Sequence, residues 1–162
     1  MSTGEVYTVV IRGGSNPFSY ISGESCNATF TVDWQRVLPY KYNKFLLKAT
    51  FRSRPSNSYT INDDCFVFVE CSAFPRNYFY DTLTDSSGYC VAVASIYPSI
   101  DTDTRFFHES IKDAPRITVN YPQQSQFTVK LTDIEGNVLS SAKYAEWVLI
   151  LELQPIKDSV SG

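Results

Sequence analysis

The stretch Phe127-Thr-Val-Lys-Leu131 alternates large apolar side chains with polar ones, and this period of two decides the fold class. Successive residues of a β-strand point to opposite faces, so its three apolar side chains are expected to share one buried face. The same alternation recurs upstream at residues 28–34 and 44–52. A half-buried antiparallel sheet is therefore the first expectation for this chain.

Turn residues such as Gly13-Gly14 and Arg54-Pro55 divide the chain into eight predicted strands. These strands cover residues 6–12, 28–34, 44–52, 65–71, 89–96, 116–120, 127–131 and 147–153. Two long loops, 72–87 and 97–115, are expected to hold a turn of helix at most. The pattern predicts an all-β protein, an eight-stranded antiparallel β-sandwich, for which the single jelly roll is the natural arrangement.

The 162 residues fit one domain, predicted as a single jelly-roll domain over 1–162. Its core is expected to span about residues 6–153, and the polar C-terminal tail 154–162 is expected to be loose. Twelve side chains are predicted to fill the space between the two sheets: Phe30, Val32, Trp34, Phe45, Leu47, Phe51, Phe127, Val129, Leu131, Trp147, Leu149 and Leu151.

Charge and hydropathy exclude several classes of function. The net charge is −3 and no block of Lys and Arg occurs, so nucleic acid is not an expected partner. The apolar run Trp147-Val-Leu-Ile-Leu151, like every other in the chain, is too short for a membrane-spanning segment. The opening residues show no signal peptide, which favours folding inside a cell under reducing conditions. The four cysteines are accordingly predicted to be free thiols; Cys65 and Cys71, at the two ends of one strand, lie too far apart to bridge.

No catalytic constellation is found in the sequence. The single histidine, His108, has no Ser or Cys motif beside it, which argues against a catalytic triad. Tight carboxylate pairs occur at Asp63-Asp64 and at Asp101 and Asp103, and the latter pair leaves open whether that loop binds an ion. Because no EF-hand or CxxC spacing exists, no catalytic residue, metal ligand or cofactor is assigned, and a non-enzymatic protein is expected.

The loop Phe74-Pro-Arg-Asn-Tyr-Phe-Tyr80 carries four aromatic residues and an arginine. Exposed aromatic residues with arginine are typical of the anchors of protein interfaces. The candidate assembly contact therefore comprises Phe74, Arg76, Tyr78, Phe79 and Tyr80. The alternative is that these rings fold back and cap the core, and the loop containing Phe106 and Phe107 offers the same choice.

The end of the chain resembles the closing strands of capsid jelly rolls from large DNA viruses and virophage-like viruses. The resemblance rests on Leu131-Thr-Asp-Ile-Glu-Gly-Asn-Val-Leu139 and on Trp147-Val-Leu-Ile-Leu-Glu152, within residues 115–153. In this pattern Asp133 and Gly136-Asn137 form a turn, Leu139 re-enters the core, and Trp147 heads the final strand.

The resemblance implies a structural virion protein without catalytic residues. A double jelly-roll major capsid protein would need well over twice this length, so the chain is similar to a penton (vertex) protein or a minor capsid protein. The implied partners are further copies of itself, as a homo-oligomer such as a pentamer, and a major capsid protein. The implied location is the capsid of a virion, after synthesis inside the host cell without secretion. The alternative is a ligand- or carbohydrate-binding β-sandwich that recognises its target through the long loops.

Overall fold

The computed structural model describes residues 4–14, 22–54, 66–74, 80–82, 86–87, 90–98, 106–110, 116–141 and 146–159. The strands are β1 (Tyr7–Gly13), β2 (Ser22–Glu24), β3 (Asn27–Thr31), β4 (Lys44–Arg54), β5 (Phe66–Cys71), β6 (Tyr80–Asp81), β7 (Ser86–Ser87), β8 (Cys90–Pro98), β9 (Phe106–Ser110), β10 (Ile117–Asn120), β11 (Gln126–Thr132) and β12 (Glu146–Pro155). One helical turn, α1 (Trp34–Val37), follows β3, and a 3-10 turn, η1 (Lys157–Ser159), follows β12.

Eight principal strands form two antiparallel four-stranded layers, β1-β12-β4-β9 and β8-β5-β11-β3. Counted along the chain, the first of the eight pairs with the last (β1 with β12) and the second with the seventh (β3 with β11). The third pairs with the sixth (β4 with β9), and the fourth pairs with the fifth (β5 with β8). A two-stranded antiparallel ribbon of eight strands, paired and folded over in this way, is the jelly-roll topology, so the predicted all-β sandwich is confirmed.

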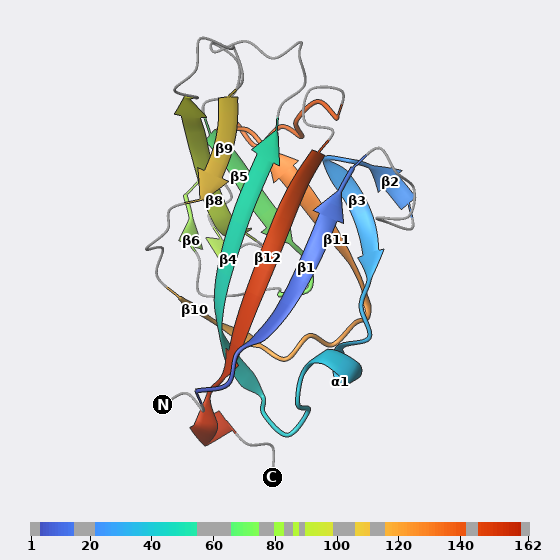
Figure 1. The fold of residues 1–162 in the computed structure, drawn as a ribbon, viewed down its shortest axis with the longest axis vertical. Coiled ribbons are helices and arrows are strands. Elements are labelled where there is room, and N and C mark those ends of the chain that lie inside the picture. The colour runs from blue at the N-terminus through green and yellow to red at the C-terminus, as the bar shows by residue number, and fades with distance from the viewer. Residues whose placement is uncertain are drawn as a thin grey trace.

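The two layers meet along one side, where β9 pairs with both β4 and β8. In Figure 1, β1, β12 and β4 lie in front, while β3, β11 and β5 lie behind them. The short strand β2 extends the rear layer beyond β3, and β10 pairs with the first half of β4. Strands β6 and β7 form a separate two-stranded ribbon.

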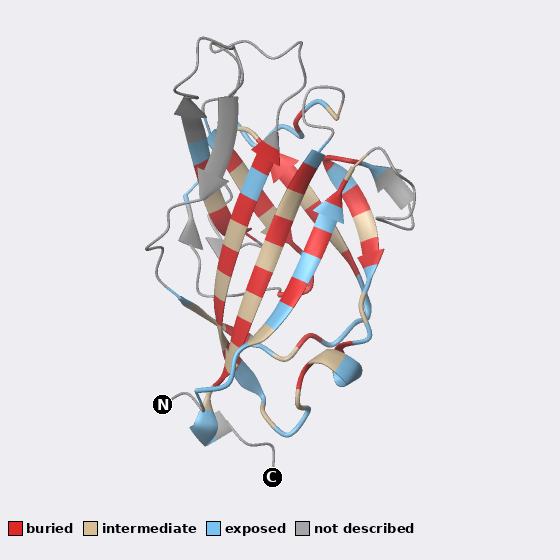
Figure 2. Ribbon diagram, in the orientation of Figure 1, coloured by how far each residue is buried: buried red, intermediate tan, exposed pale blue. Residues whose placement is uncertain are grey.

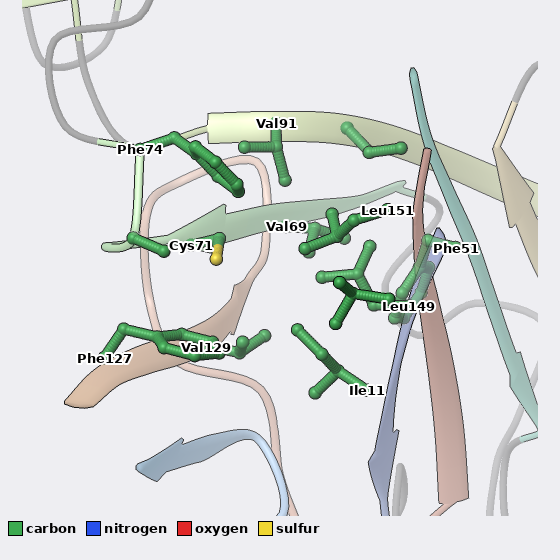
Figure 3. Packing of buried hydrophobic residues seen from close by; sticks show 14 of the residues in the cluster. Ile11, Phe51, Val69, Cys71, Phe74, Val91, Phe127, Val129, Leu149 and Leu151 are labelled. Atoms are coloured by element: carbon green, nitrogen blue, oxygen red, sulfur yellow. The ribbon is translucent and has the colours of Figure 1, made fainter. Parts of the chain in front are cut away.

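The core lies between the layers. Buried and outward residues alternate along β1, β4 and β12, as the stripes in Figure 2 show. Eleven of the twelve predicted core residues are buried, and Val32 is partly buried against the same cluster. Figure 3 shows Leu149 and Leu151 of one layer facing Val69 and Val129 of the other. The period of two therefore located the core correctly.

Three local predictions were wrong. The sixth of the eight principal strands is β9, which lies inside the predicted loop 97–115, whereas the predicted strand at 116–120 is the accessory strand β10. Trp34 is buried but belongs to α1, because the strand ends at Thr31 and the indole turns inward to donate from Nε1 to the Gln124 carbonyl over 3.1 Å. The tail is not loose up to Ser159, since Pro155 pairs with Phe45 and η1 follows.

Candidate assembly surfaces

The predicted contact segment begins in the core. Phe74 is only 1% exposed, and its ring packs edge-on against Trp34 with centroids 5.8 Å apart. The reason is a turn directly after β5, in which the Phe74 amide donates to the Cys71 carbonyl over 3.3 Å and directs the ring inward. The prediction that Phe74 is a contact residue is therefore wrong, and the capping alternative describes it.

The rest of that segment stays a prediction. Arg76, Tyr78 and Phe79 lie outside the described residues. The backbone of Tyr80 pairs with Ser87 in the β6–β7 ribbon, which places this residue in a strand instead of a loop. The carboxylates of Asp101 and Asp103 also lie outside the described residues, and His108 is placed by its backbone in β9 opposite Ser53.

Within the described ranges no group of three or more His, Cys, Asp or Glu residues has the placement of a metal site. Cys26, Cys71 and Cys90 are buried free thiols, as predicted, and Cys65 is not among the described residues. Complete burial raises the pKa of the Cys71 thiol to about 12. The three cysteines thus serve as small core side chains, and the Cys71 thiol stays protonated at neutral pH.

The outer face of β1, β12 and β4 carries an aliphatic strip. Val10 is 49% exposed, and its neighbour across the ladder is the half-buried Ile150. Val148, the next outward residue of β12, lies between Arg12 on β1 and Arg52 on β4. At the other end of the strip, Glu152 lies between Thr8 and Lys48. This face therefore has an apolar centre with charged ends, a distribution common in protein interfaces.

A hollow of about 590 Å³ opens at one end of this face. It is lined by Arg12, Gly13, Arg52, Ser53, Glu146, Trp147 and Val148. The Ser53 hydroxyl is buried and has no hydrogen-bond partner among the described residues. Trp147 is not free to bind a ligand through its indole N–H, because Nε1 donates to the Ser25 carbonyl over 2.8 Å. The hollow thus combines the side chains of two arginines and one glutamate with the buried Ser53 hydroxyl.

The outer face of the second layer carries aromatic residues. Phe66 is 43% exposed, and Phe68 lies opposite Val93 on the neighbouring strand β8. The same face continues into a half-buried ion pair, Lys130 Nζ to Glu70 Oε2 at 3.2 Å. Both outer faces of the sandwich therefore present apolar side chains to solvent.

The closing motif forms the turn that its sequence predicts. Asp133 Oδ1 accepts from the amides of Glu135 and Asn137, each over 2.9 Å, and Gly136 has a φ of 87°. Leu139 then re-enters the core, where its amide donates to the Leu131 carbonyl over 3.0 Å. The turn leaves Ile134 and Val138 exposed.

The closing motif therefore forms an ordered turn that returns the chain to the core.

None of the described helical segments is long and apolar enough to cross a bilayer. No known family model and no curated protein sequence matches the chain.

Proposed function

We propose that this chain is a non-enzymatic structural protein of a virion, a single jelly-roll penton or minor capsid protein that assembles with itself and with a major capsid protein. The observation that carries the proposal is the strand pairing, first with eighth through fourth with fifth, combined with the closing motif of residues 131–139 and 147–152. Jelly rolls also serve as lectin and cupin domains, so the closing motif is the feature that favours a capsid role here.

Surface complementarity is the mechanism in this proposal. Exposed apolar side chains occur on both outer faces, with Val10 on one and Phe66 on the other. A shell component needs contacts on more than one side, because it meets both copies of itself and a second protein. Symmetry repeats each contact, so contacts that are weak singly hold the assembly together.

Co-sedimentation with the major capsid protein of the same virus tests the proposal. The purified chain is expected to shift to the large species only when that protein is present and assembled. A globular protein of similar size and charge serves as the control for trapping. Sedimentation of the chain as a separate small species beside assembled shells would contradict the proposal.

A ligand-binding module is the second candidate, and the hollow between Arg12 and Arg52 favours it. Two guanidinium groups beside the buried Ser53 hydroxyl suit an anionic group, such as the carboxylate or sulfate of a glycan. A glycan array read with the purified monomer separates the two candidates. Binding of one defined acidic glycan that is lost in Arg52→Ala would support the second candidate, and an empty array would remove its basis.

A further inference from the structure

Strand β1 is an open edge of the sheet. It pairs with β12 over seven residues in unbroken register, and within the described residues no strand lies on its other side. An open edge exposes unpaired backbone N–H and C=O groups, which natural proteins usually blunt with short strands, lysines, prolines or bulges. The opposite end of the sheet is blunted in this way, because β2 has only three residues. The seven residues of β1 contain no lysine, proline or bulge.

We propose that a second copy of this chain pairs with β1 in antiparallel fashion, with a two-fold axis through Val10. In this register all seven residues of the strand are paired, from Tyr7 with the partner's Gly13 to Gly13 with the partner's Tyr7. The contact is isologous, so the same patch serves both copies. The inference rests on the self-association part of the proposed function and is independent of a virion.

The charges of β1 and β12 favour this register. Arg12 is the outward residue at one end of β1, and Thr8 is the outward residue at the other end. Thr8 lies opposite Glu152 on β12. In the proposed register the partner's Arg12 pairs with Thr8 from the other side, so Thr8 alone separates the partner's Arg12 from Glu152. Two strand spacings separate these Cα atoms, about 10 Å, so the charged ends of both side chains extend towards each other over the short threonine.

Among the described residues, neither Arg12 nor Glu152 forms an ion pair. Four positions along the strand separate Arg12 from Thr8, and Arg12 lies opposite Val148, not Glu152. Lys48 lies opposite Glu152 on β4, but no ion pair joins them in the described structure. The proposed dimer therefore forms two equivalent cross-strand charge pairs that the monomer lacks.

The two-fold axis through Val10 also continues the apolar strip from one copy to the other. Val10 meets its own copy at the two-fold axis, so the outward row becomes Ile150, Val10, the partner's Val10 and the partner's Ile150. The most exposed residue of the strip is thereby covered. If the register between the two β1 strands shifted by one residue, Val10 would pair with an inward-facing residue of the partner. The contact between the two Val10 side chains and the pairing of Arg12 with Glu152 would then both be lost.

The experiment is sedimentation equilibrium of the purified full chain and two charge reversals. Arg12→Glu and Glu152→Arg should each weaken the homodimer by about tenfold or more, because each places like charges across the axis. An equimolar mixture should form a heterodimer as tight as the wild-type dimer, since both of its charge pairs are then attractive. The matched control is Arg52→Glu, which reverses an outward charge away from the edge and should leave dimerisation unchanged.

A second measurement reads the register without relying on charge. Val10→Cys should form a disulfide-linked dimer on mild oxidation, because paired residues on the axis have Cα atoms about 4.5–5.5 Å apart. Val138→Cys, at a valine of similar exposure (46% against 49%), is the control and should link far more slowly.

A wild-type chain that stays monomeric, a mixture that fails to associate, or equal linking of the two cysteine variants would each overturn the inference. A dimer that never enters particles would contradict the proposed function alone. Incorporation of a strictly monomeric chain would contradict the inference alone.

Discussion

Replacing Trp147 with alanine should be among the most destabilising single changes in this protein. The indole is 4% exposed, lies 5.9 Å from the Phe30 ring and 6.2 Å from the Phe51 ring, and donates to the Ser25 carbonyl. Truncation of a large buried aromatic side chain costs about 3–5 kcal/mol of unfolding free energy. Trp147→Phe keeps most of the apolar contact and leaves the buried Ser25 carbonyl without its donor, so its cost should be smaller, about 1–3 kcal/mol.

Gly13 adds a specific test of the geometry. It lies directly opposite Trp147, and a Cβ atom built on it would overlap the indole ring. Gly13→Ala should therefore destabilise the protein by about 1–3 kcal/mol through overpacking. In the Trp147→Ala background the added methyl group enters the space that the indole has left, so the second cost should shrink or vanish. The two substitutions are expected to be non-additive by about 0.5–3 kcal/mol.

Urea unfolding followed by circular dichroism measures all four free energies. The dependence of the unfolding free energy on urea should stay constant across the cycle, since the area exposed on unfolding changes little. Trp34 remains in every variant and provides fluorescence as a second probe of the same transition. A cost below about 1 kcal/mol for Trp147→Ala, or additive costs for the pair, would refute this packing of the indole against Gly13.

Four further outcomes are expected. The three described cysteines should resist alkylation in the native state, and denaturation without reductant should yield four adducts in all; a disulfide-linked peptide would contradict this. Because the Cys71 pKa is raised from 9.0 to about 12, its contribution to stability is present below pH 9 and is lost as the pH rises towards 12, and Cys71→Ala should reduce that loss. Phe74→Ala should lower the melting temperature, whereas Tyr78→Ala and Phe79→Ala should leave it nearly unchanged and reduce incorporation into particles; normal incorporation by a folded double mutant would exclude that contact. Asp133→Ala removes an acceptor of two backbone amides, so it should cost about 1–2 kcal/mol and speed hydrogen exchange at Glu135 and Asn137, and unchanged exchange would argue against the turn.

Alternation in the sequence was sufficient to predict the sandwich and its core, because each long strand has one buried face. It could not reveal β9, since Phe106-Phe-His-Glu-Ser110 has no alternation of its own and is held by pairing with β4 and β8. The polar composition of residues 154–162 predicted a loose tail, but Gln154 and Pro155 continue the strand pairing with β4. The position of Trp34 fits the strand period as well as it fits one helical turn.

The candidate surfaces were harder to predict than the core. Aromatic content drew attention to the segment 74–80, where Phe74 proves to be a core residue. The signal for the aliphatic strip was present in Trp147-Val-Leu-Ile-Leu151, which is apolar at inward and outward positions alike. A strand that is apolar on both faces exposes one apolar face to solvent unless another molecule covers it. Only the pairing of β1 with β12 shows that this outer face of β12 continues to the open edge of the sheet.

The most direct test of a role in the capsid is the composition of the particles themselves. Virions purified on a gradient and washed with salt should contain this chain in a fixed ratio to the major capsid protein, measured by quantitative mass spectrometry. Treatment of intact particles with protease should leave that ratio unchanged, because a shell component is held by its neighbours. Absence of the chain from infectious particles, or its loss on washing while the shell stays intact, would contradict the account.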